Sequence, residues 1–490
     1  MLKGVVDFIT LGCSKNLVDA ERVMRQLEAA GWRCVHDAEE PKGEVCVVNT
    51  CGFIGDAKEE SINVILQMAE RKKRGQLKTL IVMGCLSERY RAELEKELPE
   101  VDAYYGKFDF LGIIDFLKAS APSSAKNVLP RTRTFAFPNR KRTFLSEDTR
   151  LPECSTYERK LTTPKHYAYL KISEGCNRMC SYCAIPLITG RHTSRPKEEI
   201  LAEVRWLVSQ GVKELNVIAQ DLSSYGLDLG NGEGTNGRMA KGERHLLPEL
   251  IDEIAQVEGV EWIRLHYAYP TDFPEELLDV MAKHENVCKY LDIALQHCTD
   301  HMLELMRRHI TQAEQDALIQ KIRERVPGIC IRTTLMVGHP GETEEDFEAL
   351  KAWTRKMRFD RMGAFAYSDE EGTYANKHYK DDVPEEVKQA RLSELMAIQQ
   401  EISGELMQRF VGTTQRVIID RQEGDYYIGR TQYDSPEVDC EVLVMAKGVV
   451  SDRSVQTNGR MLNGEEVKVG EFVDVEITKA EEFDLYGILC

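Results

Sequence analysis

The sequence of 490 residues predicts an α/β protein in three parts: a parallel α/β domain, a central partial (β/α)6 barrel and a small carboxyl-terminal β-barrel. Apolar strands alternate with amphipathic helices near the amino terminus, and the alternation resumes after a break in the pattern. The final segment instead has short strands separated by turns. We expect an amino-terminal domain over residues 1–120, a linker over 121–161, a core over 162–398 and a barrel over 403–490.

Three strands of the first domain each lead into a cysteine and then a helix. The expected strands are Val5–Thr10, Val45–Thr50 and Leu80–Gly84, followed by Cys13, Cys51 and Cys85, with helices from about Leu17 to Ala30, Ala57 to Lys72 and Glu88 to Leu98. Ligands gather outside the carboxyl ends of parallel strands, so the three thiols are candidates for one metal site. The alternative is three ordinary buried cysteines that fall near strand ends.

The regular pattern fails in the linker. Its basic residues are Arg131, Arg133, Arg140, Lys141 and Arg142, interleaved with Phe135, Phe137 and Phe144. Basic residues with aromatic neighbours can contact nucleic acid. We interpret the segment as a solvated linker and as the main domain boundary.

The core is expected to contain six β/α units. The predicted strands are Tyr167–Ser173, Glu214–Ala219, Trp262–Tyr269, Tyr290–Gln296, Cys330–Val337 and Met362–Ser368, with a helix over Lys197–Gln210 after the first. A parallel array of this kind curves into part of the eight-fold barrel, with its chemistry at the carboxyl ends of the strands.

A cysteine loop follows the first core strand. Cys176, Cys180 and Cys183 have the spacing C-x3-C-x2-C, which supplies three thiolates from one turn. A cubane iron–sulfur cluster held by three cysteines keeps one iron open for a ligand. Structural zinc, the alternative, needs four ligands, and the nearest spare one is His192, nine residues downstream.

Composition restricts the class of protein. The sequence has neither a signal peptide nor a long apolar run, and its 14 cysteines indicate reduced thiols and metal ligands, so we expect a cytosolic protein. The net charge of -17 argues against a general polyanion binder. Ordinary buried cysteines are expected at Cys34, Cys46, Cys288, Cys330 and Cys440, while Cys154, Cys298 and Cys490 stay open.

The cysteine loop, with Tyr182 before its last cysteine, resembles the signature of the radical S-adenosylmethionine (SAM) enzymes. The runs Leu11–Asp19, Asn49–Ile54 and Met83–Cys85 resemble the amino-terminal domain of the methylthiotransferases. The resemblance implies two 4Fe-4S clusters, an auxiliary one on Cys13, Cys51 and Cys85 and a radical one on Cys176, Cys180 and Cys183. It also implies that SAM is cleaved to a 5′-deoxyadenosyl radical, which removes a hydrogen atom from the target, so no general base is needed.

Three further positions are candidates for binding SAM. Tyr182 belongs to the signature, and Gly341 lies in a glycine-proline turn that resembles a wall of the SAM pocket. The same turn could simply join a strand to a helix capped by Thr343. Arg332 could contact the carboxylate or ribose of SAM, or form a structural ion pair.

The carboxyl-terminal segment follows a long helical stretch, Pro384 to Phe410. Its predicted strands are Arg416–Asp420, Tyr426–Arg430, Glu441–Val444 and Phe472–Ile477, and it resembles the TRAM domain, which often binds RNA in relatives. From residue 412 to 490 it has sixteen acidic residues and eight basic ones. RNA binding needs basic residues against phosphates, so we expect a basic protein partner and no direct RNA binding.

The amino-acid sequences of several motifs resemble those of one branch of the family most closely. That branch adds a methylthio group to the β-carbon of an aspartate in the basic small-subunit ribosomal protein S-twelve (uS12). The alternatives are a methylthiotransferase for an adenosine of tRNA, and a non-catalytic ribosome-associated protein with structural clusters. The resemblance implies an electron donor such as flavodoxin or ferredoxin, and we expect a monomer.

Overall fold

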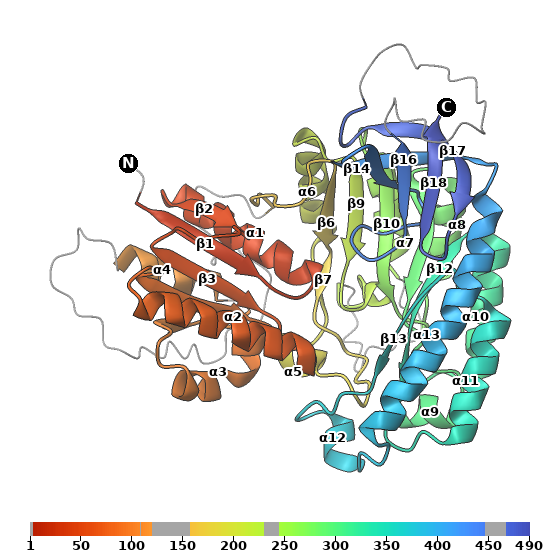
Figure 1. Cartoon of the computed structure of the whole chain (residues 1–490), viewed down its shortest axis with the longest axis horizontal. Helices are drawn as coiled ribbons and strands as arrows, with labels where there is room; N and C mark the ends of the chain where they lie inside the picture. The colour runs from red at the N-terminus through yellow and green to blue at the C-terminus, as the bar shows by residue number, and fades with distance from the viewer. Residues whose placement is uncertain (1–2, 108, 120–156, 230–244, 446–466) are drawn as a thin grey trace.

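A computed structural model of the chain describes residues 3–107, 109–119, 157–229, 245–445 and 467–490. The amino-terminal domain lies beside the core, and the small barrel covers one end of the core strands (Figure 1). Most of the predicted linker, including the eight basic and aromatic residues named above, lies outside the described residues. None of the described helices is long and apolar enough to cross a membrane.

The amino-terminal domain is a parallel sheet with helices on both faces. Its elements are β1 Val5–Thr10, α1 Ser14–Ala29, β2 Arg33–His36, β3 Val45–Thr50, α2 Gly55–Lys73, β4 Thr79–Gly84, α3 Cys85–Glu97, β5 Ala103–Tyr104 and α4 Phe110–Ala119. The strand order is β2-β1-β3-β4-β5. One apolar core joins the sheet to α1 and α4, and a second joins it to α2 and α3. The predicted parallel α/β domain is confirmed.

The core is an open parallel sheet of six strands. Its elements are β6 Tyr167–Lys171, β7 Ser173–Glu174, α5 Ile185–Thr189, β8 Thr193–Ser194, α6 Lys197–Ser209, β9 Glu214–Ile218, η2 Leu222–Ser224, α7 Leu247–Ala255, β10 Trp262–Ala268, α8 Glu276–Lys283, β11 Val287–Ile293, α9 Asp300–Leu305, α10 Gln312–Arg325, β12 Cys330–Val337, α11 Glu344–Met357, β13 Arg361–Ala366, α12 Tyr374–His378, α13 Glu385–Met407 and η3 Gln408–Phe410. The spatial order β13-β12-β11-β10-β9-β6 follows the chain, as in a partial (β/α)6 barrel. The predicted core fold is confirmed.

A closed five-stranded barrel ends the chain. Its strands are β14 Thr414–Glu423, β15 Tyr426–Arg430, β16 Glu441–Met445, β17 Phe472–Ala480 and β18 Asp484–Leu489, in the order β14-β15-β16-β18-β17. Alternating residues such as Val417 and Ile419 fill its interior. The predicted small barrel is confirmed; β18, which closes it, was not among the predicted strands.

The loop between β15 and β16, residues 431–440, attaches the barrel to the core. The guanidinium of Arg361 binds Asp434 over 2.6 Å, and that of Arg264 donates to the carbonyl oxygen of Gln432 over 2.6 Å. The hydroxyl of Tyr290 donates to Asp439 over 2.7 Å. This loop therefore closes the amino-terminal end of the core sheet, away from the cysteine loop.

Buried charges join the amino-terminal domain to the core. Glu203 of α6 receives three guanidinium groups, from Arg22 at 3.4 Å, Arg159 at 3.1 Å and Arg195 at 2.7 Å, and all four side chains are almost completely buried. A single buried carboxylate that holds cations from both domains fixes their relative position, since losing any partner leaves a charge uncompensated.

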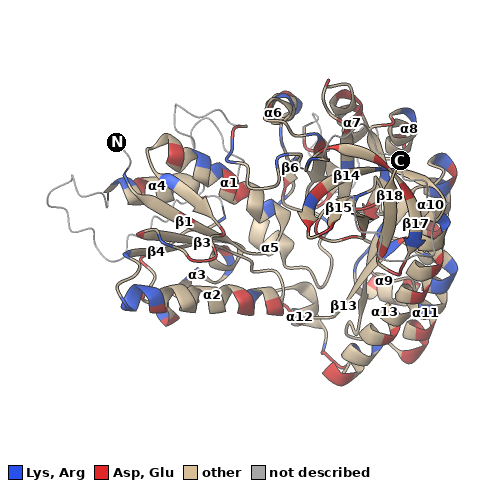
Figure 2. Ribbon diagram, turned by 45° about the horizontal axis from the view of Figure 1, so that its top comes forward, with Lys and Arg blue, Asp and Glu red and all other residues tan. Residues whose placement is uncertain are grey.

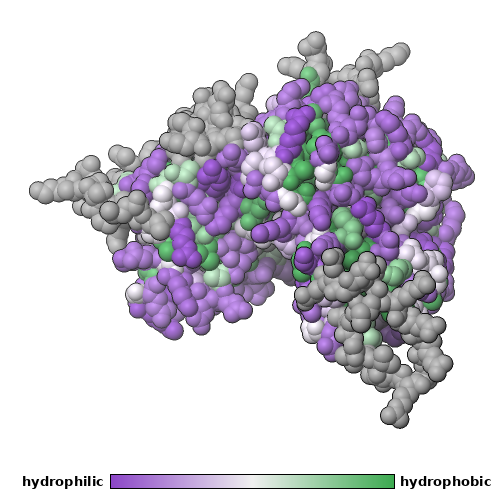
Figure 3. Space-filling model, turned by 90° about the horizontal axis from the view of Figure 1, so that it is seen from above, coloured by the Kyte–Doolittle hydropathy of each residue, from purple (hydrophilic) through white to green (hydrophobic). Residues whose placement is uncertain are grey.

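The charges on the surface of α2 follow the polarity of this helix. Figure 2 shows acidic residues along the amino-terminal part of α2 and basic residues at its carboxyl end, where Arg71, Lys72 and Lys73 lie. This distribution complements the helix dipole. Seen from above, the surface is mainly hydrophilic with smaller hydrophobic areas (Figure 3).

Candidate functional site

The first three cysteines lie together at one edge of the amino-terminal sheet. Cys13 precedes α1, Cys51 follows β3 and Cys85 begins α3, and their strands β1, β3 and β4 are neighbours. A Cβ atom added at Gly12, where φ is +89°, would lie 3.0 Å from the sulfur of Cys51. Glycine is therefore required for the two thiol-bearing loops to approach each other. Their role as cluster ligands stays a prediction.

Asn16 links the three cysteine loops. Its amide nitrogen donates to the carbonyl oxygens of Leu11 and Thr50 over 3.1 and 3.0 Å, and its Oδ1 accepts from the sulfur of Cys85 over 3.4 Å. Asn49 in turn donates to the Asn16 carbonyl oxygen over 2.8 Å. Sequence reasoning missed both asparagines, although Asn16 lies three residues from Cys13 and Asn49 two residues from Cys51.

The electrostatic surroundings of these thiols differ. Desolvation by the surrounding protein opposes ionisation of Cys13 even though its side chain reaches the surface, but the ammonium groups of Lys15 and Lys107 and nearby backbone N–H groups outweigh this effect and lower its pKa. Burial raises the pKa of Cys51, and it raises that of Cys85 to about 12. Cys13 is also exposed, while Cys85 is buried. The edge is thus open at Cys13.

The second three cysteines follow the carboxyl end of β6, between β7 and α5. Gly175, with φ at +80°, starts the loop, and a Cβ atom there would lie 2.1 Å from the carbonyl oxygen of Arg191. The backbone N–H of Arg178 donates to the sulfur of Cys176 over 3.4 Å. Burial raises the pKa of Cys176 well above its usual value and that of Cys183 to about 12.

Two core residues contact the sulfur of Cys180. The Arg308 guanidinium donates to it over 3.3 Å, and the Tyr269 hydroxyl lies 3.4 Å from it. Arg308 also stacks on the Tyr269 ring at 4.0 Å and reaches the Tyr182 hydroxyl over 3.4 Å. Sequence reasoning missed Arg308 and Tyr269 because their proximity to the cysteine loop depends on packing between distant elements.

The two groups of thiols meet at the domain interface. Cys85 packs against Ala184 and Ile188, and Ala184 directly follows Cys183 in the chain. Beside them the buried ammonium of Lys107 lies 3.2 Å from Glu174 and 3.5 Å from Asp19. The cysteine-bearing edges of both sheets therefore face each other.

The chemistry of the donor sets fits iron–sulfur clusters. Among the residues that the structure describes, no three His, Cys, Asp or Glu side chains come close enough to hold a single metal ion. A cubane cluster instead binds each thiolate through a different iron, which places the sulfurs farther apart. Donors from Arg178 and Arg308 point at sulfur atoms, as around iron-bound thiolates.

The three predicted SAM-binding positions have distinct surroundings. The Tyr182 ring packs edge-on against His339 at 6.3 Å. The N–H of Gly341, where φ is +86°, donates to Asp382 over 2.9 Å. Thr343 caps α11, as the simpler interpretation of this turn expects. Contact with SAM stays a prediction for both positions.

Arg332 lies farther toward the barrel. Its guanidinium pairs with Asp292 at 3.5 Å and with Asp439 of the 431–440 loop at 3.3 Å. The structure thus shows the ion pair that was one of the two interpretations, while a contact with SAM stays a prediction. Of the remaining cysteines, those expected to be buried are buried, as is Cys298; Cys490 is exposed, and Cys154 lies outside the described residues.

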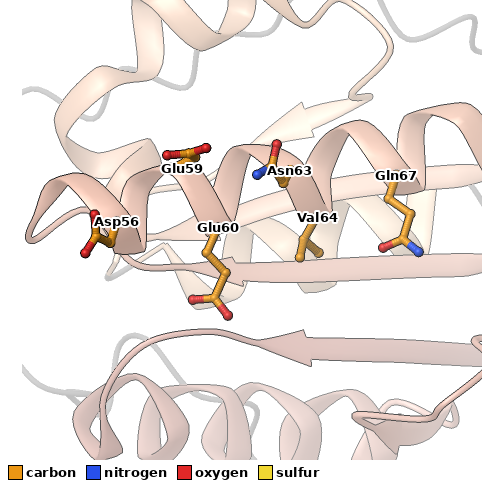
Figure 4. Close-up of a pocket in the computed structure, with 6 residues that line it drawn as sticks. All are labelled: Asp56, Glu59, Glu60, Asn63, Val64 and Gln67. Carbon is orange, nitrogen blue, oxygen red and sulfur yellow. The ribbon is translucent and has the colours of Figure 1, made fainter.

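A shallow surface pocket elsewhere does not belong to this site. It follows the exposed face of α2 and is lined by Asp56, Glu59, Glu60, Asn63, Val64 and Gln67 (Figure 4). It contains no thiol and no strand end, so we assign it no chemistry.

Comparisons with known proteins agree with this geometry. Residues 5–106 match the family described as Uncharacterized protein family UPF0004, residues 170–354 the Radical SAM superfamily and residues 411–489 the TRAM domain. These ranges fall within the three predicted domains. Among solved structures, the radical S-adenosylmethionine methyltransferase TsrM from Kitasatospora setae covers 75% of each chain, with a TM-score of 0.51 and 16% identity, which shows the fold alone.

Full-length relatives are more specific. The ribosomal protein uS12 methylthiotransferase RimO of Phocaeicola vulgatus is 57% identical over 99% of both chains. The protein of the same name from Bacteroides thetaiotaomicron is 57% identical over 98% of this chain and 97% of its own. That of Flavobacterium johnsoniae is 47% identical over 99% of this chain and 98% of its own. The chain belongs to the family of ribosomal protein uS12 methylthiotransferases.

Proposed function

We propose that the protein is a radical SAM methylthiotransferase that adds a methylthio group to the β-carbon of an aspartate side chain of uS12. The observation that carries the proposal is the packing of Cys85 against Ala184, which brings two sets of three thiols to one interface. Full-length relatives named for uS12 support this substrate over the tRNA adenosine.

Two 4Fe-4S clusters and SAM would supply the radical and sulfur chemistry. We propose Cys13, Cys51 and Cys85 as ligands of the auxiliary cluster and Cys176, Cys180 and Cys183 as ligands of the radical cluster, with SAM near Tyr182 and Gly341. Arg308 holds the Cys180 sulfur in place, and Asn16 fixes the three loops of the auxiliary site. The ion-paired side chains between the domains are almost completely buried and hold the two sites in a fixed relative position.

The net negative charge of the barrel favours a basic partner, but some of its carboxylates interact with residues of the core. Asp434 and Asp439 pair with core arginines, and Glu437 accepts from the hydroxyl of Tyr167 over 3.0 Å. Among the described barrel residues, the exposed acidic ones are Glu423, Asp425, Glu437, Asp474, Glu476 and Glu482. This surface suits uS12 better than RNA. A monomer that receives electrons from flavodoxin or ferredoxin completes the proposal.

The test is anaerobic reconstitution with iron, sulfide, SAM and dithionite, followed by mass spectrometry of added uS12 and of tRNA hydrolysates. The proposal expects 5′-deoxyadenosine and a methylthio-aspartate in uS12. Methylthio-adenosine in tRNA with unmodified uS12 would instead favour the alternative substrate. If protein with full iron content formed no 5′-deoxyadenosine, the clusters would have a structural role and the proposal would fail.

A further inference from the structure

Lys15 is a buried cation without a carboxylate partner among the described residues. Its side chain is only 8% exposed, yet no Asp or Glu oxygen described in the structure lies within ion-pair distance of its ammonium group. Its ammonium group instead lies over the ring of Tyr267, whose centroid is 3.2 Å from Nζ. Burying a charge without a counter-ion is costly, so such a cation is suited to an anionic ligand.

The backbone at Tyr267 is strained in a way that presents this ring. Tyr267 has φ at +65°, which is rare for an aromatic residue, and the pairing of β10 with β11 shifts register between Leu265 and Ala268. An irregularity of this kind redirects a side chain at a strand end, and strain of this size persists mainly at functional sites. The Tyr267 side chain remains 37% exposed.

The contact joins the two elements that carry residues of the thiol sites. Lys15 is two residues from Cys13, and Tyr267 is two residues from Tyr269, whose hydroxyl contacts the sulfur of Cys180. The nearby carboxylate of Asp292 already has the guanidinium of Arg332 at 3.5 Å and the Tyr267 N–H at 3.3 Å. Because Asp292 is held by Arg332, the ammonium group of Lys15 is available to a substrate anion as well as to the neighbouring Cys13 thiolate.

We propose that Lys15 binds the side-chain carboxylate of the target aspartate, with the Tyr267 ring as its support. This inference rests on the proposed function, because it takes the substrate to be an aspartate of uS12. The carboxylate is bonded to the carbon that is modified, so pairing it with Lys15 places that carbon between the thiol groups. The SAM carboxylate is the other possible anion, but SAM is expected at the open iron beside Cys180, next to Arg308 and Tyr182.

The experiment measures binding of reconstituted holoenzyme to uS12 and to uS12 with asparagine at the modified position. The wild-type enzyme should bind the aspartate form at least about tenfold more tightly, since the ammonium–carboxylate pair is lost with asparagine. Lys15→Met should bind both forms equally, and Lys15→Arg should recover part of the discrimination. Tyr267→Phe should discriminate like the wild type, whereas Tyr267→Leu should discriminate less.

Binding is compared between preparations with equal iron content per chain. Because Lys15→Arg keeps the positive charge beside Cys13, discrimination that is lost in Lys15→Met and recovered in Lys15→Arg reports the charge of this side chain rather than damage to the site. Lys479→Met is the matched control, because Lys479 also stacks on a tyrosine, Tyr486 at 5.0 Å, but lies on the exposed barrel. Undiminished discrimination in Lys15→Met would overturn the inference. A weaker affinity of Lys15→Met for SAM, with the preference for the aspartate form of uS12 intact, would also overturn it and would assign Lys15 to SAM binding. If the wild-type enzyme does not modify uS12 at all, the proposed function fails instead.

Discussion

The guanidinium of Arg308 donates a hydrogen bond to the sulfur of Cys180 over 3.3 Å, from a side chain that is 2% exposed. A buried positive charge beside a cluster ligand stabilises the reduced, more negative state of the cluster. Arg308 of the core is thus expected to raise the reduction potential of the proposed radical cluster.

Replacing Arg308 with Met should lower the reduction potential of the radical cluster. A loss of roughly 1.4 kcal/mol corresponds to about 60 mV for one electron, so a shift of tens of millivolts is expected. Electron paramagnetic resonance during a redox titration measures it. Tyr269→Phe should give a smaller shift in the same direction, and Arg307→Met, which changes a neighbour stacked on Tyr374, should give none. An unchanged potential in Arg308→Met would contradict this role.

The two groups of cysteines should be separable by iron analysis. Cys176→Ala should reduce iron from about eight to about four atoms per chain and abolish 5′-deoxyadenosine, because the radical cluster is lost. Cys13→Ala should lose a similar amount of iron but still form 5′-deoxyadenosine, without modifying uS12. Cys288→Ala, at a buried cysteine away from the site, should keep its iron. Equal iron contents in all three variants would refute the assignment.

Lys107→Met should destabilise the interface between the first two domains. The substitution leaves the buried carboxylates of Asp19 and Glu174 with one partner fewer, and removing one member of a buried pair typically costs about 3–5 kcal/mol. A lower urea midpoint with an unchanged slope would report this loss. Lys73→Met, which removes an exposed pair with Glu100, should leave the midpoint nearly unchanged.

The junction of barrel and core should weaken in acid. Burial opposes ionisation of Asp420, but Arg430 and hydrogen bonds from His166 and Arg430 outweigh it and lower the pKa of Asp420 to about 2. The pKa of this carboxyl group is near 3.9 in the unfolded protein and lower in the folded one. Ionised Asp420 therefore stabilises the folded state at pH values above about 3.9, and this stabilisation is lost as the pH falls toward 2. Its full size is about 2–3 kcal/mol. Thermal unfolding of Asp420→Asn should therefore differ from that of the wild type at pH 6 and converge with it near pH 2. A difference independent of pH would contradict the assignment.

The sequence predicted the parts of the site that depend on strand order. Parallel strands share one carboxyl edge, so a cysteine after β1, β3 and β4 had to lie near the others once the strands were recognised. Short elements were missed, because the four residues of β2 and the two of β5 are too few to show a period.

Contacts between distant elements were beyond sequence reasoning. Arg332 and Asp439 are 107 residues apart, so the chain alone left the ion pair and the SAM contact as equal alternatives. Arg308 approaches Cys180 from 128 residues away, and Lys15 meets Tyr267 across a domain boundary. Such pairs follow from how the domains pack, which local patterns do not encode.

The 431–440 loop makes the barrel a structural part of the core. A shortened chain that ends after α13 would deprive Arg264, Arg332 and Arg361 of acceptors in one step. A barrel transplanted from another protein would succeed only if it carried carboxylates and carbonyls at the same places in its loop. We therefore expect the core and the barrel to be exchangeable between proteins only as one unit.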